Sequence, residues 1–158
     1  MILVVVGTQE PFDRLVRAID DWAGENGNKD IFGQISRATY LPINFEFTNF
    51  IPPKQFHEKF LTADIIVGHA GMGIIIQALQ HSKPIIVMPR LAAFHETRND
   101  HQLSTAKSLG RLGYVRDVYS EAELFSALDS AKSIKPAKPI GDSASLSLLN
   151  YLSDFLKS

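Results

Sequence analysis

The sequence predicts an α/β fold in which a doubly wound parallel sheet carries helices on both faces. Short, continuous apolar runs such as Ile2–Val6 and Ile65–Val67 are typical of strands that are buried on both faces. These runs alternate along the chain with stretches of helical periodicity, and such alternation favours a parallel sheet. With 158 residues, 45% of them hydrophobic, the chain has the size and apolar content of one domain.

The first part of the chain begins with a strand and an amphipathic helix. Ile2–Val6 is the predicted first strand, and a helix is predicted over about Phe12–Ala23, where apolar residues recur at three- and four-residue spacing. Pro11 precedes this helix, and its fixed φ suits a helix start. Further elements are then predicted: strands at Ile31–Ile35 and Phe47–Phe50, and a helix at Lys54–Leu61 after two prolines.

The middle of the chain repeats the strand and helix alternation. The strand that begins at Ile65 is expected to end at Gly68, followed by a glycine-rich turn and a helix from about Ile74. A second strand is expected to end at Pro89, before a polar loop and another helix. A strand at Gly113–Val115 and a helix at Glu121–Leu128 complete the predicted domain, which spans residues 1–131.

The last part of the chain has a different composition. Residues 132–141 contain two prolines and three lysines and are predicted to be an extended linker. Residues 142–158 are predicted to form a terminal helix over Asp142–Lys157, with apolar side chains over a broad arc. That helix either packs on its own sheet or offers a docking face to another protein.

Composition and charge exclude several classes of protein. The chain has no cysteine, so it has neither disulfides nor cysteine-based metal or redox sites, which fits a cytosolic protein. A formal net charge of −1 without a basic stripe gives no sign of nucleic-acid binding. No apolar stretch approaches the roughly 20 residues needed to span a bilayer, and the opening MILVVV is too short for a signal peptide.

The turn between the Ile65 strand and the next helix is a candidate anion site. Gly71 and Gly73 allow a ligand to approach the backbone, and the helix N-terminus beyond them offers free N–H groups and a positive dipole end. A tight turn with no ligand is the equally open alternative. The G-x-x-G-x-G order differs from the dinucleotide fingerprint, and no P-loop sequence is present.

Two further loops contribute candidate binding residues. Gly7, Thr8 and Gln9 follow the first strand and face the same strand-end crevice, although Thr8 could equally cap the first helix. Asn99 and His101 begin the helix after the Pro89 loop, together with Asp100 and Gln102. Neutral imidazole and amide groups both donate and accept hydrogen bonds, while Asn99 or Asp100 could also cap the helix.

Charged residues in the Pro89 loop are weaker candidates. Arg90 and Arg98 could bind a phosphate or a uronate carboxylate, although surface arginines usually face water. His95 and Glu96 lie in the same loop, but no H-E-x-x-H pair or similar helical spacing is present, so no metal site is predicted.

Four motifs occur in an order that resembles a known family. They are VVVGTQEPFDRLVRAID, GHAGMG, KPIIVMP and NDHQLSTAKSLGRLGY, and they cover the chain through about Tyr114. Together they resemble the C-terminal domain of family 28 glycosyltransferases. The likeness is greatest to stand-alone subunits of this family: the E-type subunit of bacterial exopolysaccharide glycosyltransferases and the eukaryotic catalytic subunit of the dolichol pathway that uses UDP-GlcNAc.

The resemblance implies the Rossmann-like half of a GT-B glycosyltransferase, the half that binds a UDP-sugar. A membrane-associated partner subunit would bind the lipid-diphosphate-linked acceptor, and the terminal helix would help to dock the two chains. The implied enzyme transfers a sugar, with glucuronate as the candidate, in exopolysaccharide biosynthesis. It would be cytoplasmic and peripheral at the inner membrane face, through its partner, and would need neither a metal nor another cofactor.

The family pattern also implies roles for individual residues. It places the donor diphosphate over residues 69–73, which include His69 and Met72, and a ribose-binding carboxylate at the position held here by Gln77. It assigns His101 and Gln102 to the hydroxyl groups of the donor sugar. Ile74 replaces the usual hydroxyl residue and Gln77 the usual glutamate, which opens a second interpretation: a non-catalytic module that docks to a partner but has lost productive donor binding.

The catalytic base is not identified in this chain, and in the resembling systems it is expected near the acceptor half. An independent nucleotide-sugar epimerase or hydrolase is a third interpretation. It is less favoured, because the chain has only half of the cleft that such an enzyme needs.

Overall fold

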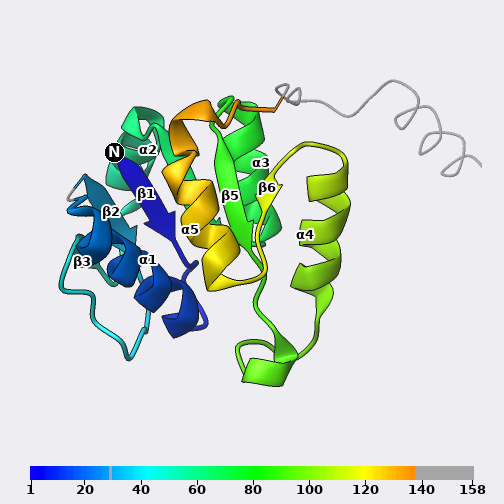
Figure 1. The fold of residues 1–158 in the computed structure, drawn as a ribbon, viewed down its shortest axis with the longest axis horizontal. Helices are drawn as coiled ribbons and strands as arrows, with labels where there is room; N and C mark the ends of the chain where they lie inside the picture. The colour runs from blue at the N-terminus through cyan, green and yellow to red at the C-terminus, as the bar shows by residue number, and fades with distance from the viewer. Residues whose placement is uncertain (29, 138–158) are drawn as a thin grey trace, which may run out of the picture.

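The computed structural model describes residues 1–28 and 30–137 (Figure 1). The predicted terminal helix and the end of the predicted linker lie outside this range. The elements, in chain order, are β1 (Ile2–Val5), α1 (Asp13–Asn26), β2 (Ile31–Gln34), β3 (Glu46–Thr48), α2 (Pro53–Thr62), β4 (Ile65–His69), α3 (Met72–Gln80), β5 (Ile85–Met88), α4 (His101–Arg111), β6 (Arg116–Asp117) and α5 (Glu121–Asp129), with short 3₁₀ helices at Ala92–Phe94 and Ala131–Ser133.

The described strands form one six-stranded sheet in the order β3-β2-β1-β4-β5-β6, and every pairing is parallel. The doubly wound fold expected from the sequence is therefore confirmed. The chain first winds from β1 toward β3 and then returns to β4 on the other side of β1. The direction of winding thus reverses between β1 and β4, and the crevice at the carboxyl ends of these two strands is where ligands of such sheets bind.

Two helical layers cover the sheet. In Figure 1, α1 and α5 lie in front of the sheet, α2 and α3 lie behind it, and α4 lies alongside β6. The two hydrophobic cores follow this division: side chains of α1 and α5 form one with alternate strand residues, and side chains of α2, α3 and α4 form the other. Because both faces of the sheet are covered, the central strands are apolar almost throughout.

Helix α1 holds the long connection between β2 and β3 by a buried carboxylate. The Asp20 side chain is fully buried and accepts hydrogen bonds from Tyr40 Oη at 2.6 Å, Ile43 N at 3.1 Å and Asn44 N at 2.7 Å. The bond to Asp20 and burial raise the pKa of Tyr40 to about 12. The charge of Asp20 is thus satisfied by three donors from one loop, which fixes that loop against the helix.

The predicted strand boundaries at Ile2–Val6, Ile31–Ile35 and Phe47–Phe50 are shifted by one or two residues, and two other strand predictions are wrong because of a glycine. Gly68 does not end its strand, because β4 continues to His69 and Gly68 pairs with Val5 on one side and Val87 on the other. A Cβ atom at Gly68 would lie 2.6 Å from the Val5 carbonyl oxygen, so the glycine allows close approach within the sheet. The last strand of the described residues is β6 rather than Gly113–Val115, because Gly113 adopts φ +74° in the turn after α4.

The predicted linker begins shortly after α5. Ala131–Ser133 forms a 3₁₀ turn, and Ile134 then adopts an extended conformation and packs against the core on the α1 and α5 face. Ala137 packs against the other core, so this segment passes from one face of the sheet toward the other. Within residues 1–28 and 30–137, no helix combines the length and apolar character needed to cross a bilayer.

Candidate functional site

The candidate site lies where the winding of the sheet reverses. The turn after β1 and the turn after β4 meet there, and the imidazole of His69 packs between Gly7 and Gly71. A Cβ atom would lie 3.1 Å from His69 Cε1 at Gly7 and 2.2 Å from His69 Nε2 at Gly71. Gly7 also has φ +86°. Glycine is therefore required at both positions, by the close approach of the ring and, at Gly7, also by the backbone conformation.

A cleft of about 370 Å³ opens at these two turns, and we call it the switch-point cleft. This volume lies within the range of small-molecule sites. The residues that line it include five of those predicted from the sequence: Gly7, Thr8, His69, Gly73 and Gln77. The other lining residues are Val5, Gln34, Phe50, Ile51, Pro53, Phe56 and Ile74.

The N-terminus of α3 is the polar feature of this cleft. Gly71 caps the helix, and the first helical hydrogen bond runs from Ile75 N to Gly71 O at 3.2 Å. The N–H groups of the three residues before Ile75 therefore lie at the open end of the helix, where the dipole is positive. A Cβ atom at Gly73 would meet no atom within 4 Å, so the backbone there faces open space. A diphosphate can reach these N–H groups directly.

His69 is neutral at physiological pH. Its Nδ1 lies 3.4 Å from the Val5 carbonyl oxygen, and because a carbonyl can only accept, this contact favours the tautomer with hydrogen on Nδ1. Burial and the nearby positive charge of Arg90 lower the pKa of His69 to about 4, against the opposing effect of the bond to Val5. The ring is therefore an uncharged wall of the cleft rather than a cationic phosphate ligand.

The depressed pKa of His69 makes the stability of the chain dependent on pH. The unfolded His69 titrates near 6.5 and the folded one near 4, so the unfolded state binds more protons between these values. Full stability is expected above about pH 6.5, with a loss of about 2 kcal/mol at pH 5 from this residue. Urea denaturation at pH 7 and pH 5 measures the loss. His69→Gln should reduce it, whereas substitution of the exposed His57 by Gln should not; equal losses in the two variants would contradict this assignment.

A second cleft, of about 540 Å³, lies between the turn after β1 and the loop before α4, and we call it the loop cleft. It is lined by Gln9, Glu10, His95, Glu96, Thr97, Arg98, Asn99 and His101. Three predicted binding residues, Gln9, Asn99 and His101, thus come together here. Asn99 Oδ1 accepts from the backbone N and the ring Nδ1 of His101, but the N-cap residue of α4 is Asp100, whose side chain makes no capping bond. Asp100 instead accepts from Ala92 N at 2.8 Å.

Four predicted residues line neither cleft, and one of them, Gly71, is the N-cap residue of α3 described above. The guanidinium of Arg90 is buried, and its NH2 atom donates at 2.6 Å to the carbonyl oxygens of Val6 and Glu10. Gln102 is also buried, and its Oε1 accepts from Arg90 N at 3.1 Å. Both side chains therefore face inward and stabilise the loops around the site. Met72, at the start of α3, is 49% exposed at the surface.

The apolar wall of the switch-point cleft was not foreseen from the sequence. Phe50, Ile51 and Phe56 form it together with Ile74. Gln34 supports this wall from beneath, because its Oε1 accepts from Ile51 N at 2.9 Å. The available signal was the position of Phe50 and Ile51 at the carboxyl end of the predicted Phe47–Phe50 strand, the edge where ligands bind.

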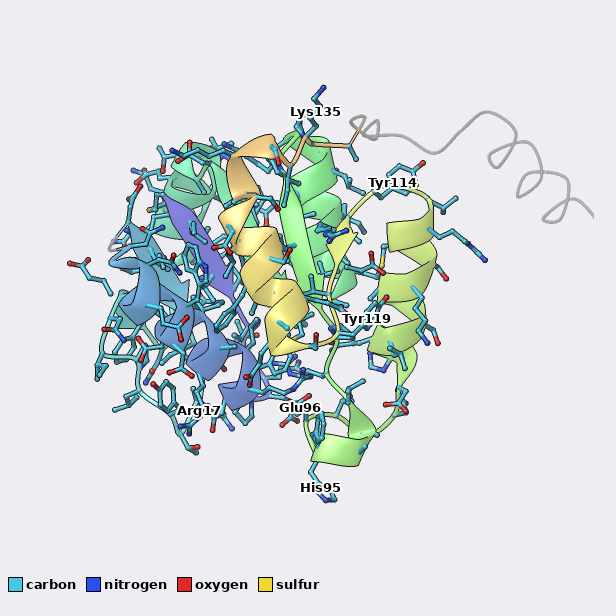
Figure 2. The ribbon with its side chains drawn as sticks, viewed as in Figure 1. Arg17, His95, Glu96, Tyr114, Tyr119 and Lys135 are labelled. Carbon is cyan, nitrogen blue, oxygen red and sulfur yellow. The ribbon has the colours of Figure 1, made fainter. Side chains whose placement is uncertain are left out.

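A larger hollow of about 880 Å³ lies at the opposite edge of the sheet, near the amino ends of β1 and β4. Lys132 and Ile134 line it, and Figure 2 shows the neighbouring Lys135 at the other end of the molecule from His95. It contains neither glycine turn nor a long-helix N-terminus among its lining residues. The arrangement of groups therefore favours the switch-point and loop clefts as the functional site.

Comparison with known families accounts for this geometry. The family model of the glycosyltransferase family 28 C-terminal domain matches residues 1–140, which includes every residue of both clefts. The chain belongs to this family. The resemblance expected from the four sequence motifs is thereby confirmed.

The curated relatives of this family 28 domain include a human protein. It is the UDP-N-acetylglucosamine transferase subunit ALG13 of Homo sapiens, which is 28% identical over 146 residues. The match covers 86% of this chain and 12% of the human protein. The chain therefore spans only a small part of that relative.

Solved structures agree on the fold. The glycotransferase of kitacinnamycin superposes with a TM-score of 0.62 at 21% identity, covering 99% of this chain and 38% of that one. An NMR structure of ALG13 also gives a TM-score of 0.62, at 22% identity, covering 99% of this chain and 96% of that one. These likenesses support the predicted fold class, the Rossmann-like half of a GT-B glycosyltransferase.

The family 28 chain has no candidate metal centre within the part that the structure describes. There, no three His, Cys, Asp or Glu side chains are grouped so that they could hold an ion. Ile74, which departs from the family pattern, is buried in the core beneath α3 and also lines the cleft. Its side chain therefore leaves the backbone N–H groups of the helix start accessible.

Proposed function

We propose that this family 28 chain is the donor-binding subunit of a two-component glycosyltransferase that uses a UDP-sugar. The observation that carries the proposal is the open N-terminus of α3 at the reversal point of the sheet, with Gly73 facing empty space. Helix N–H groups and the helix dipole favour a diphosphate there without a metal ion. The name of the human relative, a UDP-N-acetylglucosamine transferase subunit, supports a UDP-sugar and a multi-subunit enzyme.

The two clefts divide the donor between them in this proposal. The apolar wall of the switch-point cleft takes the nucleoside, and Gln77 accepts a hydrogen bond from a ribose hydroxyl. The sugar lies in the loop cleft, where His101 and Asn99 meet its hydroxyl groups. The leaving diphosphate is stabilised by the start of α3, which is the electrostatic part of the reaction.

The acceptor site and the general base belong to a second subunit in this proposal. We propose a membrane-associated subunit that binds a lipid-diphosphate-linked acceptor and provides the general base, with this chain held at the cytoplasmic membrane face through it. The FDRL sequence at the start of α1 resembles the exopolysaccharide branch of the family, which supports a role in exopolysaccharide biosynthesis. Arg98, which lines the loop cleft, supports a uronate such as glucuronate, because a guanidinium binds a carboxylate well.

Substitution of Gln77 by Glu tests the nucleoside position. A carboxylate would make a charge-assisted hydrogen bond to the ribose, so we expect the affinity for UDP to rise about fivefold. Calorimetric titration of the chain with UDP in the presence of EDTA measures this and also checks that binding needs no divalent metal. Gln80→Glu, on the exposed surface of the same helix, is the matched control and should change nothing. An unchanged UDP affinity for the Gln77 variant would place the ribose elsewhere.

A non-catalytic docking module is the second candidate function. It is favoured by Ile74 and Gln77, which replace the hydroxyl and carboxylate residues of the family pattern. Transfer by the chain reconstituted with its partner separates the two candidates. Loss of transfer in His101→Ala would exclude the non-catalytic module, whereas the absence of transfer by the wild-type pair with any UDP-sugar would favour it.

A further inference from the structure

Arg14 links helix α1 to the loop that carries most of the loop cleft. Its Nε donates to Glu96 Oε1 and its NH2 donates to Glu96 Oε2, both at 2.8 Å, so the two side chains form a bidentate ion pair. NH2 also donates at 2.9 Å to the carbonyl oxygen of Pro89, and NH1 contacts the sulfur of Met88 at 3.1 Å. The two side chains are only 19% and 10% exposed, so solvent screens this pair less than an ordinary surface pair.

The surroundings of the pair restrict its geometry further. The guanidinium carbon of Arg14 lies 5.2 Å from the ring centres of both Phe12 and Phe94, so aromatic rings hold it in place. Glu96 Oε2 also accepts from Leu91 N at 2.9 Å. Through these contacts, one carboxylate fixes the beginning of the loop, its middle and α1 relative to one another.

Arg90 makes the opposite connection. Its backbone lies in the loop before α4, and its side chain donates to carbonyl oxygens in the turn after β1. Each of the two loops that border the loop cleft is thus held by an arginine from the other part of the chain. Gln9 lies in the loop that Arg90 holds, and His95 lies at the outer end of the loop that Arg14 holds (Figure 2).

We propose that the Arg14–Glu96 pair positions the loop cleft for the donor sugar, and that neither residue contacts the nucleotide. The inference rests on the proposed function for its ligand. Loosening the pair would displace the loop that bears His95 and Arg98, and with it the start of α4 at His101, while the switch-point cleft, which is built from other turns, would keep its shape. The expected signature is a selective loss of the binding contributed by the sugar.

The test compares Arg14→Lys with Arg17→Lys in the full chain. Lysine keeps the charge but cannot make the bidentate bond. Arg17 lies one turn further along α1 and stacks on Tyr40, and Figure 2 shows it to the left of Glu96 in the lower half of the molecule. Amide hydrogen exchange over residues 89–100 measures the loop, and titrations with UDP, UDP-N-acetylglucosamine and UDP-glucuronate measure the clefts.

For Arg14→Lys we expect faster exchange in residues 89–100 and an unchanged UDP affinity. The ratio of the affinity for the preferred UDP-sugar to the affinity for UDP should fall about fivefold or more. A fall of this size corresponds to the loss of one or two hydrogen bonds. Arg17→Lys should match the wild type in both measurements. Unchanged loop exchange, or an equal loss of UDP and UDP-sugar affinity, would overturn the inference. A wild-type chain that binds no nucleotide would instead contradict the proposed function, while the exchange data still decide whether the pair holds the loop.

Discussion

Gly73→Ala is expected to weaken UDP binding at least tenfold while it stabilises the fold. The new methyl group would project into the space proposed for the diphosphate at the start of α3, where no atom beyond those of the neighbouring helix residues lies within 4 Å. The same position lies in the first turn of the helix, where alanine is favoured over glycine by about 0.5 kcal/mol. Calorimetric titration with UDP and urea denaturation measure the two effects, which have opposite signs.

The opposite signs make this prediction specific. A substitution that damages the fold lowers both stability and affinity, whereas Gly73→Ala should separate them. Gln80→Ala, at the exposed far end of the same helix, is the control and should leave the affinity for UDP unchanged. A Gly73→Ala chain that binds UDP as tightly as the wild type would exclude the diphosphate from the start of α3.

Gly68→Ala is expected to have the largest effect on stability. Its Cβ atom would lie 2.6 Å from the Val5 carbonyl oxygen, and both residues belong to paired central strands that have little freedom to separate. We expect a loss of about 3 kcal/mol and a Tm lower by roughly 10 °C. Thermal and urea denaturation give these values.

Gly73→Ala is the natural comparison for Gly68→Ala, because the chemical change is identical and only the surroundings differ. The methyl group of Gly73→Ala would point into open space, whereas that of Gly68→Ala would clash with a backbone carbonyl oxygen. A Gly68→Ala chain as stable as the wild type would show that β1 and β4 do not pair in the register described here.

The fold was largely predictable because the strongest signal in the sequence is the one that sheet burial produces. Strands such as Ile2–Val5 and Ile85–Met88 are buried on both faces, so their apolar runs are continuous. The clearest error in the predicted strands concerns a glycine, because glycine can play more than one structural role. Gly68 was expected to end a strand, but it permits close contact inside one, and sequence periodicity does not distinguish these two uses.

The candidate site was predicted in part. Residues whose backbone matters, such as Gly7 and Gly73, could be placed because glycine spacing and strand ends are visible in the sequence. Arg90 and Gln102 could not, because the partners of a long polar side chain depend on tertiary contacts: Arg90 bonds to carbonyls more than 70 residues away, at Val6, Glu10 and Pro11. The ion pair between Arg14 and Glu96 could not be predicted from the sequence for the same reason.

We have proposed that this family 28 chain holds a UDP-sugar across its two clefts. Two-dimensional NMR of the isotopically labelled chain, titrated with UDP, GDP and dTDP and then with UDP-N-acetylglucosamine and UDP-glucuronate, shows whether it does. We expect saturable shifts for UDP at Gly7, Gly73 and Gln77, with further shifts at Asn99 and His101 when the sugar is attached. Millimolar UDP that leaves Gly7, Gly73 and Gln77 unshifted, or that shifts only residues outside both clefts, would contradict this proposal.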